Sequence, residues 1–283
     1  MSGQFLGAGV YRLAYGDMVI WALADAAGRF SFAVLKDLAP EEIVALTGSL
    51  ANAEDQTLAR SLNAFVVKRP NVLIVVDTGL GEGRVLADGL ELAGLKPEEV
   101  TDVLLTHLHR DHVNGLLAGQ EILFPGATVW VEAQELAYWR QKAEETSDER
   151  ARTVMAKLNP YLQKGSARTF GAGQTLKPGL ETIELYGHTP GHVGFLLGEG
   201  ERRVLFFGDV AHVAAIQFSR PEVTVTFDVD PAQAAQTRAQ IYQLAARANY
   251  LVAGAHAPFP GLGRIKALSP KPRPTYAWLG LTV

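Results

Sequence analysis

The densest group of metal-ligating side chains follows a short apolar run. The segment Thr106–His112 reads THLHRDH and contains the pattern His-x-His-x-Asp-His. In extended backbone, residues two apart point to the same side, so His107 and His109 can bind one ion. If a helix begins near Asp111, this carboxylate and His112 turn toward a second ion. Neutral imidazole and carboxylate are ligands that zinc and similar divalent metals favour.

Three later segments each add a candidate at the end of an apolar run. GHTPGH contains His188 and His192 in a loop bounded by glycine and proline. FFGD places Asp209 just beyond an apolar run, and AGAH places His256 in the same way. Active-site residues of layered α/β proteins are often found where a hydrophobic strand passes into a loop. These segments therefore extend the first pattern to a set large enough for two ions.

The composition excludes several other kinds of chemistry. The 283 residues include seven histidines and no cysteine, so thiolate zinc fingers, iron–sulfur clusters and cysteine nucleophiles are absent. The net charge of −4 argues against nucleic acid as a partner. We find no run of 18 apolar residues, so we expect no membrane-spanning helix. The first 26 residues lack a basic n-region, so we expect a cytoplasmic protein, or a periplasmic one if an export signal precedes the sequence.

Short β-rich runs alternate with helical patterns and must position these side chains. We expect one domain over 1–283, with two β-rich halves and helices outside. A hairpin over 19–24 and 30–35 would turn near Gly28, and the charged run 142–152 would form a solvated helix or loop face. We expect further strands over 64–68, 72–76, 103–106, 128–131, 182–186, 193–197, 203–207, 250–253 and 275–279, and helices over 84–93, 132–142 and 232–246.

The order HxHxDH, His, Asp, His runs over most of the chain and resembles that of the metallo-β-lactamase superfamily. The segments GDVAHVAAIQF (208–218), AGAHAPFPG (253–261) and FPGATVWV (124–131) are similar to the methyl parathion hydrolase branch. That branch is related to the quorum-quenching acyl-homoserine lactonases. The resemblance implies an α/β fold, specifically a four-layer αββα sandwich with two divalent metal ions between the sheet edges.

The resemblance also implies a role for each candidate ligand. One ion would be held by His107, His109 and His188, the other by Asp111, His112 and His256, with Asp209 as the bridge. His192 would support the site or the local fold without binding metal. Asp77, in the segment VVDTG, matches a supporting aspartate of the family. Its alternative role is to cap the turn at Thr78.

Two ions can share a bridging hydroxide that acts as the nucleophile at neutral pH. We expect zinc, although manganese, cobalt and iron accept similar ligands. Asp111 would orient the nucleophile or carry a proton. The lactonases place a tyrosine three residues after the bridging aspartate, where this chain has His212. His212 can donate to a developing oxyanion or a leaving oxygen, unless it serves only buried hydrogen bonding.

An apolar residue occupies this position in methyl parathion hydrolase, so His212 favours lactone or aryl-ester substrates, with promiscuous phosphotriester cleavage. Trp139 and Phe227, together with His212, are expected to line an aromatic pocket for a small neutral ester, lactone or phosphotriester. A homodimer is expected from the resemblance alone. The alternatives are a dedicated organophosphorus hydrolase and a non-catalytic metal-binding sensor.

Other classes match the sequence less well. The segment GLGEG (79–83) follows a strand that ends in aspartate, but Arg84 breaks the dinucleotide pattern GxGxxG. A flavodiiron oxidoreductase would carry glutamate at His109, and a zinc β-lactamase often has cysteine at Asp209. Glyoxalase II stays open, although the HAPFPG segment does not resemble it.

Overall fold

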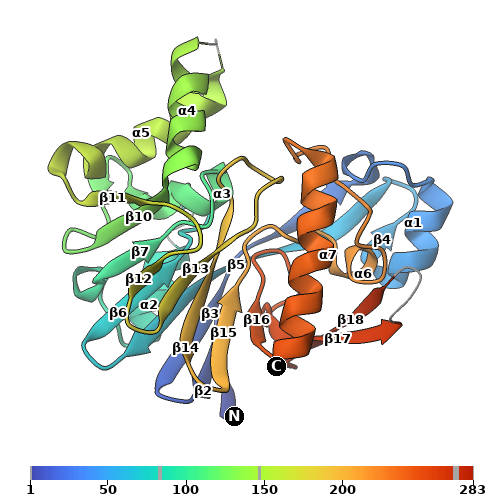
Figure 1. Cartoon of the computed structure of the whole chain (residues 1–283), viewed down its shortest axis with the longest axis horizontal. Helices are drawn as coiled ribbons and strands as arrows, with labels where there is room; N and C mark the ends of the chain where they lie inside the picture. Colours follow the sequence, from blue (N-terminus) through green and yellow to red (C-terminus); the bar gives the residue numbers. More distant parts are fainter. Residues whose placement is uncertain (1, 82–84, 146–147, 270–273, 283) are drawn as a thin grey trace.

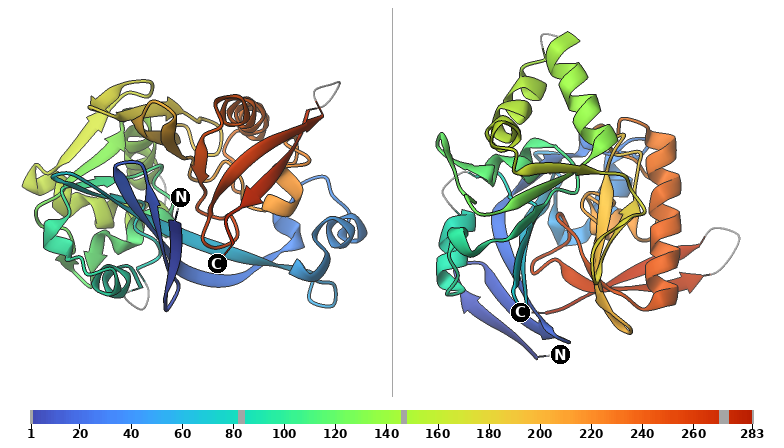
Figure 2. Two further views of the ribbon diagram at one scale, coloured as in Figure 1. Left: turned by 90° about the horizontal axis from the view of Figure 1, so that it is seen from below. Right: turned by 60° about the vertical axis from the view of Figure 1, so that its left-hand side comes forward.

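The computed structural model describes residues 2–81, 85–145, 148–269 and 274–282. Two large β-sheets lie face to face, and helices cover their outer faces (Figure 1 and Figure 2). The helices are α1 (Pro40–Thr47), α2 (Val85–Leu92), α3 (Arg110–Val113), α4 (Ala133–Glu145), α5 (Glu149–Lys164), α6 (Ala214–Gln217) and α7 (Pro231–Ala248). Single 3₁₀ turns lie at Phe32–Val34, Gly48–Leu50, Pro97–Glu99 and Asn114–Leu116.

The first sheet contains the N-terminal half of the chain. Its strands are β1 (Ser2–Gly7), β2 (Val10–Tyr15), β3 (Met18–Ser31), β5 (Thr57–Arg69), β6 (Val72–Val76), β7 (Asp102–Leu104), β10 (Thr128–Glu132) and β11 (Ala167–Phe170), in that spatial order. The strand β4 (Ala51–Asn52) pairs with β5 off this path. Pairing is antiparallel from β1 to β6 and parallel from β6 to β11.

The second sheet contains the C-terminal half. Its strands, in order, are β12 (Thr175–Lys177), β13 (Leu180–Glu184), β14 (Val193–Glu199), β15 (Arg202–Phe206), β16 (Leu251–Ala253), β17 (Leu262–Ser269) and β18 (Thr275–Gly280). Only the β15–β16 pair is parallel among these described strands. A separate ribbon joins β8 (Leu117–Ala118) to β9 (Glu121–Ile122).

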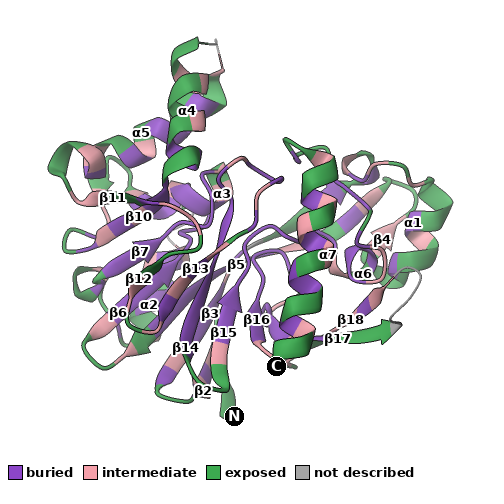
Figure 3. Ribbon diagram, viewed as in Figure 1, coloured by how far each residue is buried: buried purple, intermediate pink, exposed green. Residues whose placement is uncertain are grey.

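Three apolar clusters hold these layers together. One lies between the sheets and includes Phe65 and Phe206, whose ring centroids are 5.5 Å apart. The second packs the outer face of the first sheet against α2, α4 and α5, and the third packs the second sheet against α7. Buried residues accordingly follow the strands and the inner faces of the helices (Figure 3). The chain is therefore a four-layer αββα sandwich, which confirms the expected fold class.

The long helix α7 shows how local sequence sets these layers. The Asp230 side chain accepts from the backbone N–H of Gln233, and Pro231 occupies the first turn, so the helix begins there. The helix ends at Ala248, and its C-cap residue Asn249 has a left-handed φ of 53°. Its buried residues recur every three or four positions: Ala234, Arg238, Ile241, Tyr242 and Ala245. The apolar members Ile241, Tyr242 and Ala245 pack against the second sheet.

The predicted hairpin over 19–24 and 30–35 is wrong. The strand β3 runs unbroken from Met18 to Ser31 and pairs with β5 along that length, with a register shift between Ala24 and Ala26. Gly28 lies opposite Arg60 on β5, so the glycine is part of the ladder and makes no turn. The exposed residues 27–29 are small or charged, so they resemble a turn in sequence. In the structure they pair with the long strand β5 and stay extended.

Most other predicted strands are present with small boundary shifts, and β5 and β6 form the expected antiparallel pair. Thr106 lies beyond the end of β7, and Arg84, the predicted start of α2, lies outside the described residues. The charged run 142–152 spans the end of α4 and the start of α5, with 146–147 outside the description. Within the described ranges, no helix has both the length and the apolar character needed to cross a bilayer.

Candidate metal centre

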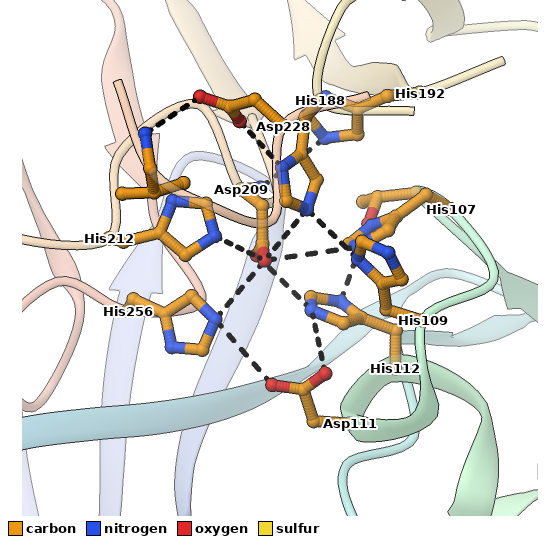
Figure 4. Close-up of polar contacts among 12 residues, drawn as sticks. His107, His109, Asp111, His112, His188, His192, Asp209, His212, Asp228 and His256 are labelled. Carbon is orange, nitrogen blue, oxygen red and sulfur yellow. Dashed lines mark hydrogen bonds and ion pairs between the residues drawn. The ribbon is translucent and has the colours of Figure 1, made fainter. Parts of the chain in front are cut away.

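The candidate ligands come together from loops of both sheets. His107 and His109 follow β7, and Asp111 and His112 lie in α3 directly after them. His188 lies between β13 and β14, whereas Asp209 follows β15 and His256 follows β16. Figure 4 shows Asp209 at the centre, with the imidazoles around it. The structure thus brings together all seven residues predicted as ligands.

His107, His109 and His188 form what we call the first ligand group. The Nδ1 atom of His109 lies 2.9 Å from Nε2 of His107 and 2.9 Å from Nε2 of His188. Oδ2 of Asp209 lies 3.8 Å and 3.4 Å from those two Nε2 atoms. The four ligand atoms all lie within 4.8 Å of one another, a spacing that suits one ion.

Asp111, His112 and His256 form the second ligand group. Nε2 of His112 lies 3.1 Å from Oδ1 of Asp209, and Nε2 of His256 lies 3.2 Å from its Oδ2. Asp111 approaches both imidazoles, with oxygen–nitrogen distances of 3.9 Å to His112 and 3.6 Å to His256. Because the two Asp209 oxygens face both groups, this carboxylate can bridge two ions.

The polar atoms at the centre have the pattern that a bound cation would complete. Among the described residues, Nε2 of His112 and Oδ1 of Asp209 are buried and, although 3.1 Å apart, make no hydrogen bond with each other or with another group. In the first group, Nε2 of His107, Nδ1 of His109 and Nε2 of His188 converge on one point. The other ring nitrogen of His188, Nδ1, is bonded to Asp228 at 2.9 Å. Converging lone pairs in a buried place are costly unless a proton or a metal lies between them. The cluster therefore fits divalent metal ions.

A further set of contacts orients the rings. Oδ2 of Asp77 lies 2.8 Å from Nδ1 of His112, and its Oδ1 accepts from the backbone N–H of Thr106 at 2.8 Å. Nδ1 of His256 lies 2.9 Å from the carbonyl oxygen of Ser61. Such partners place the proton on one ring nitrogen and leave the other free for a metal. Asp77 thus lies where the predicted supporting aspartate should be.

Burial and neighbouring charges set the protonation of the cluster. Burial lowers the pKa of His107 and His109 well below its ordinary value, which keeps these rings neutral. Burial alone would raise the pKa of Asp209, but the neighbouring histidines lower it well below the ordinary value. Burial would likewise lower the pKa of His188, yet hydrogen bonds to Asp209 and Asp228 raise it to about 9. A cation bound here would displace that proton.

His192 lies behind the cluster and has both ring nitrogens engaged. Nδ1 donates to the carbonyl oxygen of Leu185 at 3.1 Å, and Nε2 accepts from the backbone N–H of Asp209 at 3.3 Å. Burial lowers the pKa of His192 to about 3. The neighbouring Gly208 has a φ of 52°, and a Cβ there would lie 2.6 Å from Nε2 of His192. His192 therefore supports the Asp209 loop and has no nitrogen left for a metal.

Aromatic rings flank the centre. His212 places Nε2 3.1 Å from Oδ2 of Asp209 and stacks on His256, with ring centroids 5.1 Å apart. With those two residues it forms a third set of potential ligands. The Phe227 ring lies 5.9 Å from His212 and is 41% exposed, so it lines the open side. The Trp139 ring lies against His109, with centroids 5.6 Å apart.

Sequence reasoning missed three residues around the site. Phe30 lies 5.9 Å from the His256 ring and 6.0 Å from Phe227, but the sequence placed it in a hairpin. Asp228 binds His188 and also accepts from the backbone N–H of Val225 at 3.0 Å. Glu135 is buried within the expected helix, where its sequence context resembles a solvated face. For Asp228 and Glu135, the only signal in the sequence was a carboxylate close to an apolar run.

The comparisons with known proteins agree with this geometry. A family model described as the metallo-beta-lactamase superfamily matches residues 58–256. The chain belongs to the metallo-β-lactamase superfamily. The structure of the hydrolase AbOPH in the beta lactamase superfamily matches with a TM-score of 0.89 and 30% identity, covering 98% of this chain and 99% of that one.

Two further relatives are similar over different extents. Hydroxyacylglutathione hydrolase GloC of Haemophilus influenzae is 30% identical over 140 residues, or 48% of this chain and 59% of that protein. The chain thus spans about three fifths of this curated relative. AidC, a dizinc quorum-quenching lactonase in complex with its homoserine product, has a TM-score of 0.83 at 23% identity, covering 97% of this chain and 98% of AidC. At 23% identity, the similarity to AidC shows a shared fold.

Proposed function

We propose that this superfamily member is a dinuclear-metal hydrolase that cleaves lactones and aryl esters, with weaker cleavage of organophosphate triesters. The observation that carries the proposal is Asp209, whose carboxylate faces both ligand groups beside an open aromatic wall. Its Oδ2 lies 3.4 Å from Nε2 of His188 in the first group and 3.2 Å from Nε2 of His256 in the second. The proposal places the chain in the methyl parathion hydrolase and lactonase branch. A homodimer is part of the same proposal and rests on the family resemblance.

The first ligand group would hold one ion, the second group the other, and Asp209 would lie between them. When bound, two divalent ions supply an activated water and a Lewis acid that polarises the carbonyl or phosphoryl oxygen. We propose zinc as the metal because imidazole and carboxylate suit it, and manganese, cobalt and iron share this preference.

Asp111 is suited to handle a proton at the open side of the centre. Its side chain is 22% exposed, compared with 3% for Asp209, so it is the carboxylate that a bound substrate can reach. Burial would raise the pKa of Asp111, but His112 and His256 lower it below the ordinary value. An ionised carboxylate at this place can orient the nucleophile and accept its proton.

His212 is suited to contact the substrate as a neutral ring. Burial lowers its pKa to about 4, so it carries no charge at neutral pH. Among the described residues, its Nδ1 is buried and has no hydrogen-bond partner. A neutral imidazole that carries its one proton on Nε2, the nitrogen directed at the centre 3.1 Å from Oδ2 of Asp209, can donate to a carbonyl or leaving-group oxygen as charge develops there. We assign this role to His212.

The walls favour flat, neutral substrates. The rings of Phe30, Phe227 and His212 lie beside one another, with centroid distances of 5.9 to 6.5 Å. Trp139 lies beside His109, at the first ligand group. Apolar rings around a few polar groups are typical of small-molecule sites. Two solved lactonases of the same fold hold the product N-hexanoyl-L-homoserine, which supports a lactone or another ester as substrate.

The test is a substrate panel assayed on chelated and metal-reloaded protein. Aryl acetate, dihydrocoumarin and acyl-homoserine lactone should be hydrolysed only after reloading, and methyl paraoxon more slowly. S-Lactoylglutathione belongs in the panel because the curated relative is named as a hydroxyacylglutathione hydrolase. A preference for methyl paraoxon would make the protein an organophosphorus hydrolase, and a preference for the thioester would make it a thioester hydrolase. Either result would contradict the proposed substrate class. Absence of turnover on every substrate by the metallated protein would favour a binding protein.

A further inference from the structure

Helix α4 holds one buried carboxylate, that of Glu135, which is 1% exposed. Its Oε1 accepts from the backbone N–H of Leu108 at 2.8 Å and from Nε1 of Trp139 at 2.8 Å. Its Oε2 accepts from the backbone N–H of Gly191 at 3.0 Å. One side chain therefore holds two backbone segments that are far apart in sequence.

These two segments supply the first ligand group. Leu108 lies between His107 and His109, and Gly191 lies three residues after His188. The carboxylate thus holds the backbone beside every imidazole of that group. Because Nδ1 of His109 lies 2.9 Å from Nε2 of His107 and 2.9 Å from Nε2 of His188, a small shift of either loop would separate these nitrogens.

The second ligand group depends on other residues. His112 is bonded to Asp77, and His256 to the carbonyl oxygen of Ser61. Nδ2 of Asn63 donates to the carbonyl oxygens of the 254–257 loop, at 2.8 to 3.2 Å. Within the described residues, the hydrogen bonds of the Glu135 side chain go to Leu108, Trp139 and Gly191, and none of these belongs to the second group. Asp77 also accepts from the backbone N–H and the hydroxyl of Thr106, next to His107, whereas the contacts of Glu135 are confined to the segments of the first group.

The packing around Glu135 leaves its contacts little freedom. A Cβ on Gly191 would lie 2.3 Å from the backbone nitrogen of Glu135, so the loop docks directly on the start of α4. Glu132 accepts from the backbone N–H groups of Gln134 and Glu135 at 2.6 and 2.9 Å, which anchors this helix end. Three donors share the two oxygens of Glu135. Glutamine, with one oxygen and one NH₂ group, cannot accept from all of them.

We propose that Glu135 is a positioning residue that builds the first ligand group. It joins the two ligand loops to α4 so that three imidazoles meet at one point, and it holds Trp139 against His109. The inference rests on the proposed function in that the first group binds an ion. Glu135 then determines the metal affinity of the first ligand group, whereas Asp77, Asn63 and Ser61 support the second ligand group.

The experiment is a metal titration of E135Q with cobalt as the probe, read by absorption spectra and by bound metal per chain. Loss of an outer partner of a metal ligand costs about 10- to 100-fold in metal affinity. We expect one of the two ions to bind 10- to 100-fold more weakly and the other to keep its wild-type affinity. E135D keeps both acceptor oxygens and should recover part of the affinity, and it carries the test if E135Q does not fold.

The matched control is D102N. Asp102 is a fully buried carboxylate that also accepts from an indole, Nε1 of Trp130, at 2.8 Å, and it lies in β7 away from the ligand groups. D102N should lower the melting temperature and keep two ions at wild-type affinity. The double variant E135Q/D77N should lose both ions, because each substitution affects a different group.

The outcomes separate this inference from the proposed function. If the wild type binds two ions and E135Q binds both with unchanged affinity, the positioning role is overturned and the proposed function stands. If D102N loses the same ion as E135Q, the effect is general destabilisation and the positioning role is also overturned. A wild type that binds no stoichiometric metal overturns both.

Discussion

Replacing Asp77 with asparagine should switch the ring proton of His112 to the wrong nitrogen. Asp77 accepts from the backbone N–H of Thr106 through Oδ1 and faces Nδ1 of His112 through Oδ2, each at 2.8 Å. Its φ of 55° is left-handed, a conformation that asparagine tolerates. D77N therefore preserves the size and backbone of the residue and changes only the chemistry of one side-chain atom.

Either orientation of the new amide costs a contact. If the amide oxygen stays on Thr106, the NH₂ group faces Nδ1 of His112, which must then accept and carry its proton on Nε2. Nε2 is the atom directed at Asp209, and a protonated Nε2 cannot bind a metal. If the amide is reversed, the buried N–H of Thr106 loses its acceptor, which costs about 1–3 kcal/mol.

The expected effect is a loss of metal affinity that is largest in the second ligand group, because Asp77 reaches the first group only through Thr106. A change of this kind weakens metal binding about 10- to 100-fold, or about 1.4–2.7 kcal/mol. Zinc competition with a chromophoric chelator measures both sites. The first ion should bind D77N within about threefold of wild type, and kcat should fall with the occupancy of the second. Wild-type affinity for both ions in a folded D77N would refute the tautomer argument.

Three further predictions follow from the same contacts. D228N should weaken the first ion about 10- to 100-fold in the same competition assay, because Asp228 is the partner of Nδ1 of His188; equal loss of both ions would contradict it. H212F should lower kcat on lactones about 100-fold while two ions stay bound, since the ring would lose its donor; a drop to one ion would instead make His212 a ligand. Chelated protein should lose stability as pH falls from 6.5 to 5. The pKa values of about 3 for His192 and about 4 for His212 lie below the unfolded value of 6.5, so the unfolded chain binds more protons. Each group then costs up to about 2 kcal/mol, and urea midpoints that stay constant over this range would refute the assignment.

The ligand set could be predicted because its information is local. The pattern at His107–His112 specifies residue types at fixed spacing, and Asp209 and His256 each follow an apolar run that predicts a strand. Strands that end at the same edge of a sheet bring their following residues together. The four-layer order followed from the resemblance, since two β-rich halves alone do not determine which faces meet.

The supporting residues could not be predicted because their partners are chosen by packing. Glu135 and Asp228 are carboxylates whose neighbours in sequence resemble those of surface acids, and only the docking of distant loops buries them. The continuous strand β3 was missed for a related reason. Residues 27–29 are exposed and small or charged, which resembles a turn, but pairing with β5 keeps them extended.

We propose that Asp209 joins two metal sites into one hydrolytic centre. Its most direct test measures bound metal and lactone turnover together, in the wild type and in D209A. We expect two ions per wild-type chain, and loss of both stoichiometric binding and turnover in D209A. Turnover by a folded D209A at the wild-type rate would contradict the two-metal account.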